Sequence, residues 1–394
     1  MWIAHSAVRG SWLGATAGAT ALGILAVTIS VLTGQPAGPP PELARVADAH
    51  LALAEAYLER DALALAEREY RTVIERPESR AYWYAMYKIG CIEHALQRYG
   101  EALETMFRVA EGTQRDPEQH GLHRAATKDF VRAYAEIGRP ETAYRSFRRV
   151  DREDAFEMLE LLADLYQKQG KHDRAIAAYH ELMTLAPTHK NVCLWQSEIV
   201  HAALWNVAGN GEAVEQVVRL VRLSRSLATA QALPAAELKA CHDRAAAISG
   251  ELARAYHVES VKAESGDPSA RAERLYEVYL DAFPDADDFA DTKYFYAELL
   301  WSRAESNWSP RHGAERWERV ATVFTSLVEL PTLDARRRQE AAQAAVLAWK
   351  NAGELKRGAR QRSAAWLRVV SDPRGTLGRI DLWSRSHWAE PRHH

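Results

Sequence analysis

Cys91 and His94 come closest to a metal-binding pattern in this sequence, because they lie three positions apart in a helical stretch. Residues at i and i+3 share one face of a helix, so the thiol and the imidazole could approach one ion. A structural zinc site takes about four such ligands, and no CxxC or HxxxH pattern supplies the others. We therefore predict packing roles for Cys91 and His94, and no metal site.

An acidic cluster follows Pro284 and consists of Asp285, Asp287, Asp288 and Asp291. It lacks the glycine and the distal glutamate of a calcium-binding loop, and acidic residues are favoured at a helix N-terminus by the helix dipole. The sequence also contains no GxGxxG, GxxxxGK[ST] or GxSxG motif, which are signatures of nucleotide-binding and hydrolytic sites. We therefore expect no catalytic residues, no cofactor and no enzymatic activity.

Composition narrows the class of protein further. The 394 residues are 47% hydrophobic and 26% charged with a net charge of -3, which argues against long-range disorder and against a basic nucleic-acid binder. Three cysteines do not make a disulfide scaffold. Cys193 and Cys241 fall inside expected helices, so we predict that they are buried rather than bonded.

The N-terminal region has the features of an export segment. Residues 11–34 contain no charged side chain and are long enough to span a bilayer, with Arg9 on the leading side. We predict that residues 1–34 are a signal anchor or a cleaved signal peptide, that residues 11–34 contact the membrane, and that residues 35–46 are a proline-rich spacer. The rest of the chain is then expected in the periplasm.

A repeat of small and aromatic residues begins after the spacer. A tyrosine, a glycine four residues later, an alanine five after that and a further aromatic four on recur twice, as Tyr134, Gly138, Ala143 and Phe147 and as Tyr166, Gly170, Ala175 and Tyr179. Parts of the same frame occur earlier, as Tyr57, Ala66 and Tyr70 and as Gly90, Ala102 and Met106. The spacing is close to the ~34 residues of a tetratricopeptide repeat, in which the alanine lets two antiparallel helices pack closely.

These patterns predict an all-α fold, namely a right-handed superhelical solenoid of antiparallel helix pairs preceded by an N-terminal hydrophobic helix. Four units are expected over residues 47–189, starting near Ala47, Trp83, Arg124 and Phe156. Degenerate helical repeats are expected over residues 190–353. Residues 354–394 are expected to be a basic, partly disordered tail, since thirteen Lys and Arg face six Asp and Glu from Asp334 onward.

Residues 43–353 resemble tetratricopeptide-repeat proteins of the myxobacterial type, and most of all those of the adventurous gliding-motility machinery in the cell envelope. The resemblance is carried by YAMYKIGCIEHALQRYGEAL from Tyr84, by ATKDFVRAYAEIGRPETAYRSF from Ala126 and the MLELLADLYQKQGKHDRAIAAYHELM stretch from Met158, and by YFYAELLW from Tyr294 with AAQAAVLAWKNA from Ala341. It implies an exported envelope scaffold. The basic tail after Lys356 departs from this family.

A stacked array of this kind exposes the first helix of each unit along a groove. We predict that the groove changes from aromatic through basic to acidic, and that Lys128 and Arg132, spaced i and i+4, grip a peptide carboxylate. The predicted groove residues are Tyr84, Tyr87, Cys91, His94, Lys128, Arg132, Glu136, Glu157, Glu160, Asp164 and Lys168. The expected function is a non-enzymatic scaffold for envelope proteins. The alternative is an accessory subunit of an envelope assembly or secretion machine that captures peptide or glycan for another enzyme.

Overall fold

The computed structural model describes residues 41–205, 210–262, 267–306 and 313–355, and within them the fold is entirely helical. The helices are α1 (Pro41–Leu58), α2 (Leu63–Ile74), α3 (Tyr82–Ala95), α4 (Tyr99–Thr113), the short 3-10 turn η1 (Pro117–Gln119), α5 (His120–Ile137), α6 (Pro140–Val150), α7 (Ala155–Lys168), α8 (His172–Leu185), α9 (Val192–Trp205), α10 (Asn210–Ala230), α11 (Ala235–Lys262), α12 (Asp267–Ala282), α13 (Phe289–Ser306), α14 (Gly313–Val328) and α15 (Ala335–Leu355).

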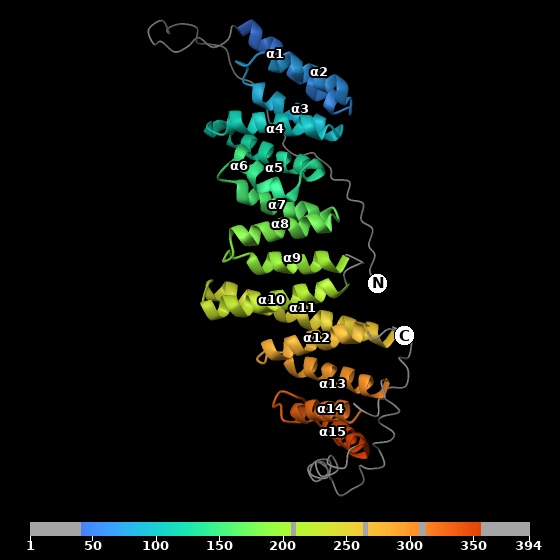
Figure 1. Cartoon of the computed structure of the whole chain (residues 1–394). Helices are drawn as coiled ribbons and strands as arrows, with labels where there is room; N and C mark the ends of the chain where they lie inside the picture. Colours follow the sequence, from blue (N-terminus) through green and yellow to red (C-terminus); the bar gives the residue numbers. More distant parts are fainter. Residues whose placement is uncertain (1–40, 206–209, 263–266, 307–312, 356–394) are drawn as a thin grey trace.

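Consecutive helices pack against each other, and the pairs stack into one elongated array from α1 at one end to α15 at the other (Figure 1). Helices two apart in the chain also touch, for example α5 with α7 and α6 with α8. Each internal pair is therefore held by its neighbours on both sides, as a repeat array requires. The expectation of an all-helical array of pairs is confirmed for the described residues.

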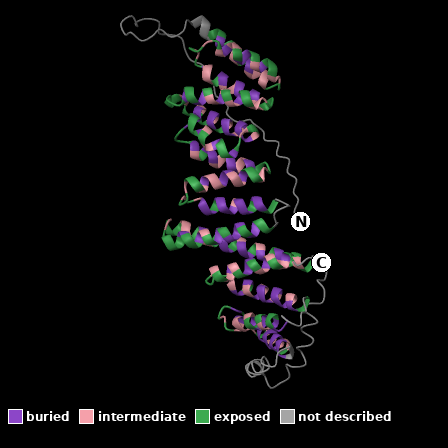
Figure 2. Cartoon of the chain, viewed as in Figure 1, coloured by how far each residue is buried: buried purple, intermediate pink, exposed green. Residues whose placement is uncertain are grey.

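The interior of the array is built at the positions that the repeat pattern predicts. The four alanines of the pattern, Ala66, Ala102, Ala143 and Ala175, are all at most 1% exposed, and so are their partners four residues on, Tyr70, Met106, Phe147 and Tyr179. The small side chain lets the two helices of a pair approach, and the large one fills the space to the next pair. Figure 2 shows buried positions along successive helices of the stack.

The turn between the two helices of a unit needs a left-handed residue in three of the first four units. Asp61, Gln97 and Gly170 have φ values of 56°, 60° and 70°, and each lies five residues before the repeat-pattern alanine of its unit. Gly138 takes this place in the third unit, where an added Cβ would lie 2.2 Å from the Tyr134 ring. Gly90, by contrast, lies inside α3 against Met106, so the turn of the second unit is at Gln97.

Two differences from the sequence-based expectations concern α1 and the cysteines. The helix α1 begins at Pro41, inside the expected spacer, because proline is well tolerated in the first turn of a helix.

The prediction that Cys193 and Cys241 are unbonded is wrong. They form a disulfide with a Cα–Cα distance of 5.5 Å that joins α9 to α11 across 48 residues of sequence. Both are buried inside their helices as expected, but stacking brings the two helices together.

The N-terminal hydrophobic segment and the basic tail lie outside the described residues, so the structure does not test the predictions made for them. Among the helices that are described, none combines the length and the hydropathy that a membrane span needs.

Candidate functional site

The predicted groove residues come from three first helices, α3, α5 and α7, which we call the first-helix face. Tyr84, Tyr87, Cys91 and His94 lie on α3, and the residues on α5 and α7 are Lys128, Arg132, Glu136, Glu157, Glu160, Asp164 and Lys168. Because α3 contacts α5 and α5 contacts α7, the fold brings all three sets to neighbouring positions. Their contacts decide which of them are free to bind a partner.

On α3, the tyrosines are tied to neighbouring helices. Glu55 of α1 accepts hydrogen bonds from the hydroxyls of Tyr70 and Tyr84, at 2.6 and 3.0 Å, and Lys88 lies 3.8 Å away. The Tyr84 ring stays 37% exposed and has the Lys88 ammonium 5.2 Å from its centre. Tyr84 therefore keeps an accessible aromatic surface while its hydroxyl is fixed.

Asp129 of α5 links the α3 and α5 parts of the face. One of its carboxylate oxygens accepts a 2.7 Å hydrogen bond from the Tyr87 hydroxyl, and the other accepts a 2.6 Å bond from Arg132. Since Arg132 is already paired, the peptide-carboxylate clamp predicted for Lys128 and Arg132 reduces in this structure to Lys128, which is exposed. Asp129 was missed because its partner Tyr87 lies 42 residues earlier in the chain.

Glu136 holds α5 to the turn before α8. Lys171 donates hydrogen bonds to the Glu136 carboxylate and to the Ala135 carbonyl, both at 2.9 Å, and Gln169 donates another to Glu136 at 2.8 Å. Burial alone would raise the pKa of Glu136, but the bonds from Lys171 and Gln169 outweigh it and hold the pKa below its ordinary value. Glu136 is thus a charged structural contact between units.

The acidic residues of α7 divide into bonded and exposed ones. Glu160 accepts from Asn191 at 2.8 Å and from the Trp195 indole at 2.9 Å, and Asp164 accepts from the Tyr179 hydroxyl at 2.8 Å. Glu157 and Lys168 are exposed. Within the described part of the chain, Lys128, Glu157 and Lys168 form no hydrogen bond or ion pair with other side chains, so these three charges are available to a partner.

Cys91 and His94 do not form a reactive pair. Burial raises the pKa of the Cys91 thiol to about 11, with the Asp129 carboxylate adding to the effect, so the thiolate is scarce at neutral pH. The His94 ring packs edge-on against Tyr99, with 5.3 Å between ring centres. The packing roles predicted for both residues agree with these contacts.

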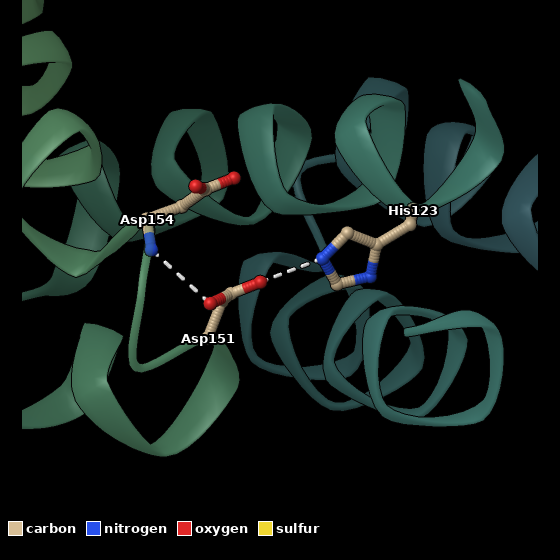
Figure 3. A group of neighbouring side chains, drawn as sticks. All are labelled: His123, Asp151 and Asp154. Atoms are coloured by element: carbon tan, nitrogen blue, oxygen red, sulfur yellow. Dashed lines mark hydrogen bonds and ion pairs between the residues drawn. The ribbon is translucent and has the colours of Figure 1, made fainter. Parts of the chain in front are cut away.

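A group of His123, Asp151 and Asp154, which the sequence did not single out, lies where α5 meets the corner between α6 and α7 (Figure 3). His123 Nε2 is 2.7 Å from an Asp151 oxygen, and Nδ1 is 2.9 Å from the Ala110 carbonyl. The other Asp151 oxygen accepts from the backbone N–H groups of Glu153 and Asp154. Every polar atom of the buried pair is therefore already bonded, and the arrangement is that of a structural hydrogen-bonded pair rather than of a metal site.

Comparisons with known proteins identify one repeat directly. Residues 156–189 match the family model for the tetratricopeptide repeat. This range covers α7 and α8 and coincides with the unit expected to start near Phe156. No curated protein matches the sequence.

Several solved structures match this chain at low similarity. A tetratricopeptide repeat protein from Parabacteroides merdae is 12% identical, with a TM-score of 0.29 over 83% of this chain and 99% of that one. A structure of Naa15/Naa10 bound to HypK-THB is 16% identical, with a TM-score of 0.29, and the match spans 84% of this chain but half of that one. The TPR domain of P58(IPK) is 12% identical, with a TM-score of 0.21 over 83% of this chain and 99% of that domain.

The assignment of the repeat therefore rests on the family match to residues 156–189. This match identifies α7 and α8 as a tetratricopeptide repeat, which lies within a described part of the chain that is helical throughout.

Proposed function

We propose that this chain is a non-enzymatic scaffold that binds a segment of another protein along the first-helix face. The observation that carries the proposal is the tetratricopeptide repeat of α7 and α8 within a stack of helix pairs. Repeat arrays of this kind present extended binding surfaces. The face offers the Tyr84 ring together with the unpaired charges of Lys128, Glu157 and Lys168. Both signs of charge favour a protein segment over a uniformly charged polymer.

We also propose that the protein acts in the cell envelope, in the periplasm, held by residues 11–34 or released after cleavage. The disulfide between Cys193 and Cys241 supports this location, because such bonds persist in oxidising compartments and are rare in the cytosol. Membership of a gliding-motility complex rests on the sequence resemblance alone.

The binding proposal is tested by placing a photo-crosslinking amino acid at position 128 in cells, with position 104 of α4 as a matched exposed control on a second helix. A discrete covalent adduct is expected from position 128 and none from position 104. The double variant Tyr84→Ala with Lys128→Glu should abolish recovery of the captured protein with the affinity-tagged chain. Equal crosslinking from both positions, or unchanged recovery by the variant, would overturn the first-helix face as the binding site.

The location is tested independently by the oxidation state of the cysteines. Cells are quenched in acid, and the denatured protein is treated with a maleimide polymer before or after reduction. One modified cysteine, Cys91, is expected before reduction and three after it. Three modified cysteines without reduction would exclude an oxidising compartment.

A further inference from the structure

A second surface, on α6, stands out because four arginines gather on it without acidic partners. Arg145, Arg148, Arg149 and Arg152 follow one face of α6 and the residues just beyond it, and all four are exposed. None forms a salt bridge with any described residue, although arginines elsewhere in the array do, such as Arg98 with Glu67 and Arg225 with Asp281. We call these four residues the arginine stripe.

The arginine stripe lines a hollow rather than a flat surface. α6 packs beside α8 (Figure 1), and a cavity of about 540 Å³ between them is bordered by the stripe together with Tyr144, Glu141 and Glu181. A second cavity of about 630 Å³ is also bordered by Glu141 and lies at the other end of α6, next to Arg139, Asp173 and Arg174. The two cavities share Glu141 and together extend along α6, and we call them the α6–α8 groove.

The helix dipole does not account for this clustering. It favours cations within the last turn of a helix, which covers Arg148 and Arg149. Arg145 lies a turn earlier and Arg152 lies beyond the helix end. Four neighbouring cations repel one another, so their placement around one hollow is better explained by a ligand that supplies negative charge. Guanidinium groups bind carboxylates in a bidentate manner.

We propose that the α6–α8 groove binds an extended acidic peptide segment of a partner protein, at a surface separate from the first-helix face. α6 has 11 residues and is therefore about 16 Å long, which matches about five residues of extended chain. The carboxylates of the peptide pair with the arginine stripe. Glu141 and Glu181 also line the cavity, and they accept hydrogen bonds from the peptide N–H groups, which a polyphosphate lacks.

The test measures binding of a fluorescein-labelled peptide of six glutamates to the full chain by anisotropy at low salt. The variant Arg145→Ala with Arg148→Ala is compared with Arg271→Ala with Arg274→Ala. The control pair has the same spacing on α12, and Arg271 lies over the Tyr256 ring as Arg148 lies over Tyr144. Circular dichroism verifies that both variants keep their helical content.

We expect the stripe variant to bind the glutamate peptide at least tenfold more weakly, the control variant to bind within twofold of the unchanged protein, and a peptide of six glutamines not to bind. Equal binding by the stripe variant would overturn the proposal. So would equal binding of the glutamine peptide, or tighter binding of inorganic polyphosphate or phosphatidylglycerol vesicles. If position 128 gives no crosslink while the glutamate peptide still binds, the proposal for the first-helix face is overturned and the proposal for the α6–α8 groove stands.

Discussion

At the residue scale, the buried pair of His123 and Asp151 explains how the corner between α6 and α7 is held. The Ala110 carbonyl can only accept, so His123 Nδ1 donates a hydrogen bond to it, and Nε2 lies 2.7 Å from an Asp151 carboxylate oxygen. Burial would raise the pKa of Asp151, but the bonds from the Asp154 N–H, His123 and the Glu153 N–H outweigh it and lower the pKa. The pair thereby joins α4, α5 and the α6–α7 corner.

Replacing Asp151 by Asn should destabilise the protein by about 1–2 kcal/mol at pH 7, because the charge-assisted bonds are weakened while the shape is kept. A carboxylate with a lowered folded-state pKa stabilises above its unfolded pKa of ~3.9, and this stabilisation is lost as the pH falls through the folded value. Denaturant unfolding at pH 7 and at pH 3 checks both statements. The control Asp154→Asn, at an exposed side chain, should change stability by less than about 0.5 kcal/mol. The same loss for Asp151→Asn at both pH values would contradict this account.

Glu298 of α13 shows the opposite shift. Burial raises its pKa to about 7, Arg337 opposes this and Glu340 adds to it. The folded state therefore holds a proton that the unfolded state releases near pH 4.3, so the stability contributed by this group falls as the pH rises from there to about 7. Glu298→Gln keeps the side chain neutral and should be more stable than the unchanged protein by about 1–3 kcal/mol at pH 8, with no gain near pH 4.

Thermal unfolding across this pH range measures the effect, and the exposed Glu329→Gln is the control. A pH-independent difference between Glu298→Gln and the unchanged protein would mean that the carboxyl is ionised at neutral pH in the folded state.

At the scale of elements, the turn inside three of the first four helix pairs needs a residue that tolerates positive φ. Gly170 meets this requirement without strain, whereas Gln97 occupies the same place in its unit with φ 60°. Non-glycine residues pay about 1 kcal/mol in this region. The turn position is thus set by geometry even where the sequence does not show a glycine.

Gln97→Gly should stabilise the protein by up to about 1 kcal/mol, while Gly170→Ala should destabilise it by about 1 kcal/mol. The gain at Gln97 is limited because glycine also makes the unfolded chain more flexible. Gly100→Ala, in the first turn of α4 with open space around it, is a control for altered glycine content. Equal effects of the substitutions at Gly100 and Gly170 would contradict a special role for the turn.

The disulfide between Cys193 of α9 and Cys241 of α11 is the second structural constraint at this scale. It closes a long loop, which restricts the unfolded chain, so Cys193→Ser with Cys241→Ser should lower the free energy of unfolding by about 2–4 kcal/mol. A reducing agent should lower the stability of the unchanged protein under unfolding conditions and leave the double variant unaffected. The Cys91→Ala variant should remain sensitive to the reducing agent. Loss of this sensitivity in Cys91→Ala would show that the effect depends on Cys91 and not on the disulfide.

At the scale of the whole molecule, the buried apolar residues of the described helices form two clusters rather than one globular core. One hydrophobic cluster runs from Met86 to Ala352, and a separate smaller cluster holds α1 and α2 against α3. Stability in such arrays comes from each unit and its contacts with neighbours, so a terminal unit with one neighbour opens more easily than a central one.

Hydrogen exchange should therefore be at least tenfold faster in α1 and α2 than in the central helices α7 to α9. Exchange followed by mass spectrometry of peptides from each helix measures this. Because α2 and α8 both contain the alanine and aromatic of the repeat, α8 is a matched internal control for α2. Uniform protection over the whole array would show that it unfolds as one cooperative unit.

The sequence by itself determined the local architecture. The spacing of Ala143, Phe147, Ala175 and Tyr179 predicted helix pairs, since the need for a small and a large side chain at fixed places is met within one unit. These features depend on residues that are near one another in the chain.

Only the tertiary structure decided which side chains are free. Asp129 engages Tyr87 and Arg132, Glu160 engages Trp195, and Cys193 meets Cys241, although the partners on different helices lie 35 to 48 residues apart. The arginine stripe became a candidate site for the same reason, since its lack of acidic partners is a property of the stacked helices. Periodicity places a residue on a helix face, but its partner there comes from another unit, and the packing of the units selects that partner.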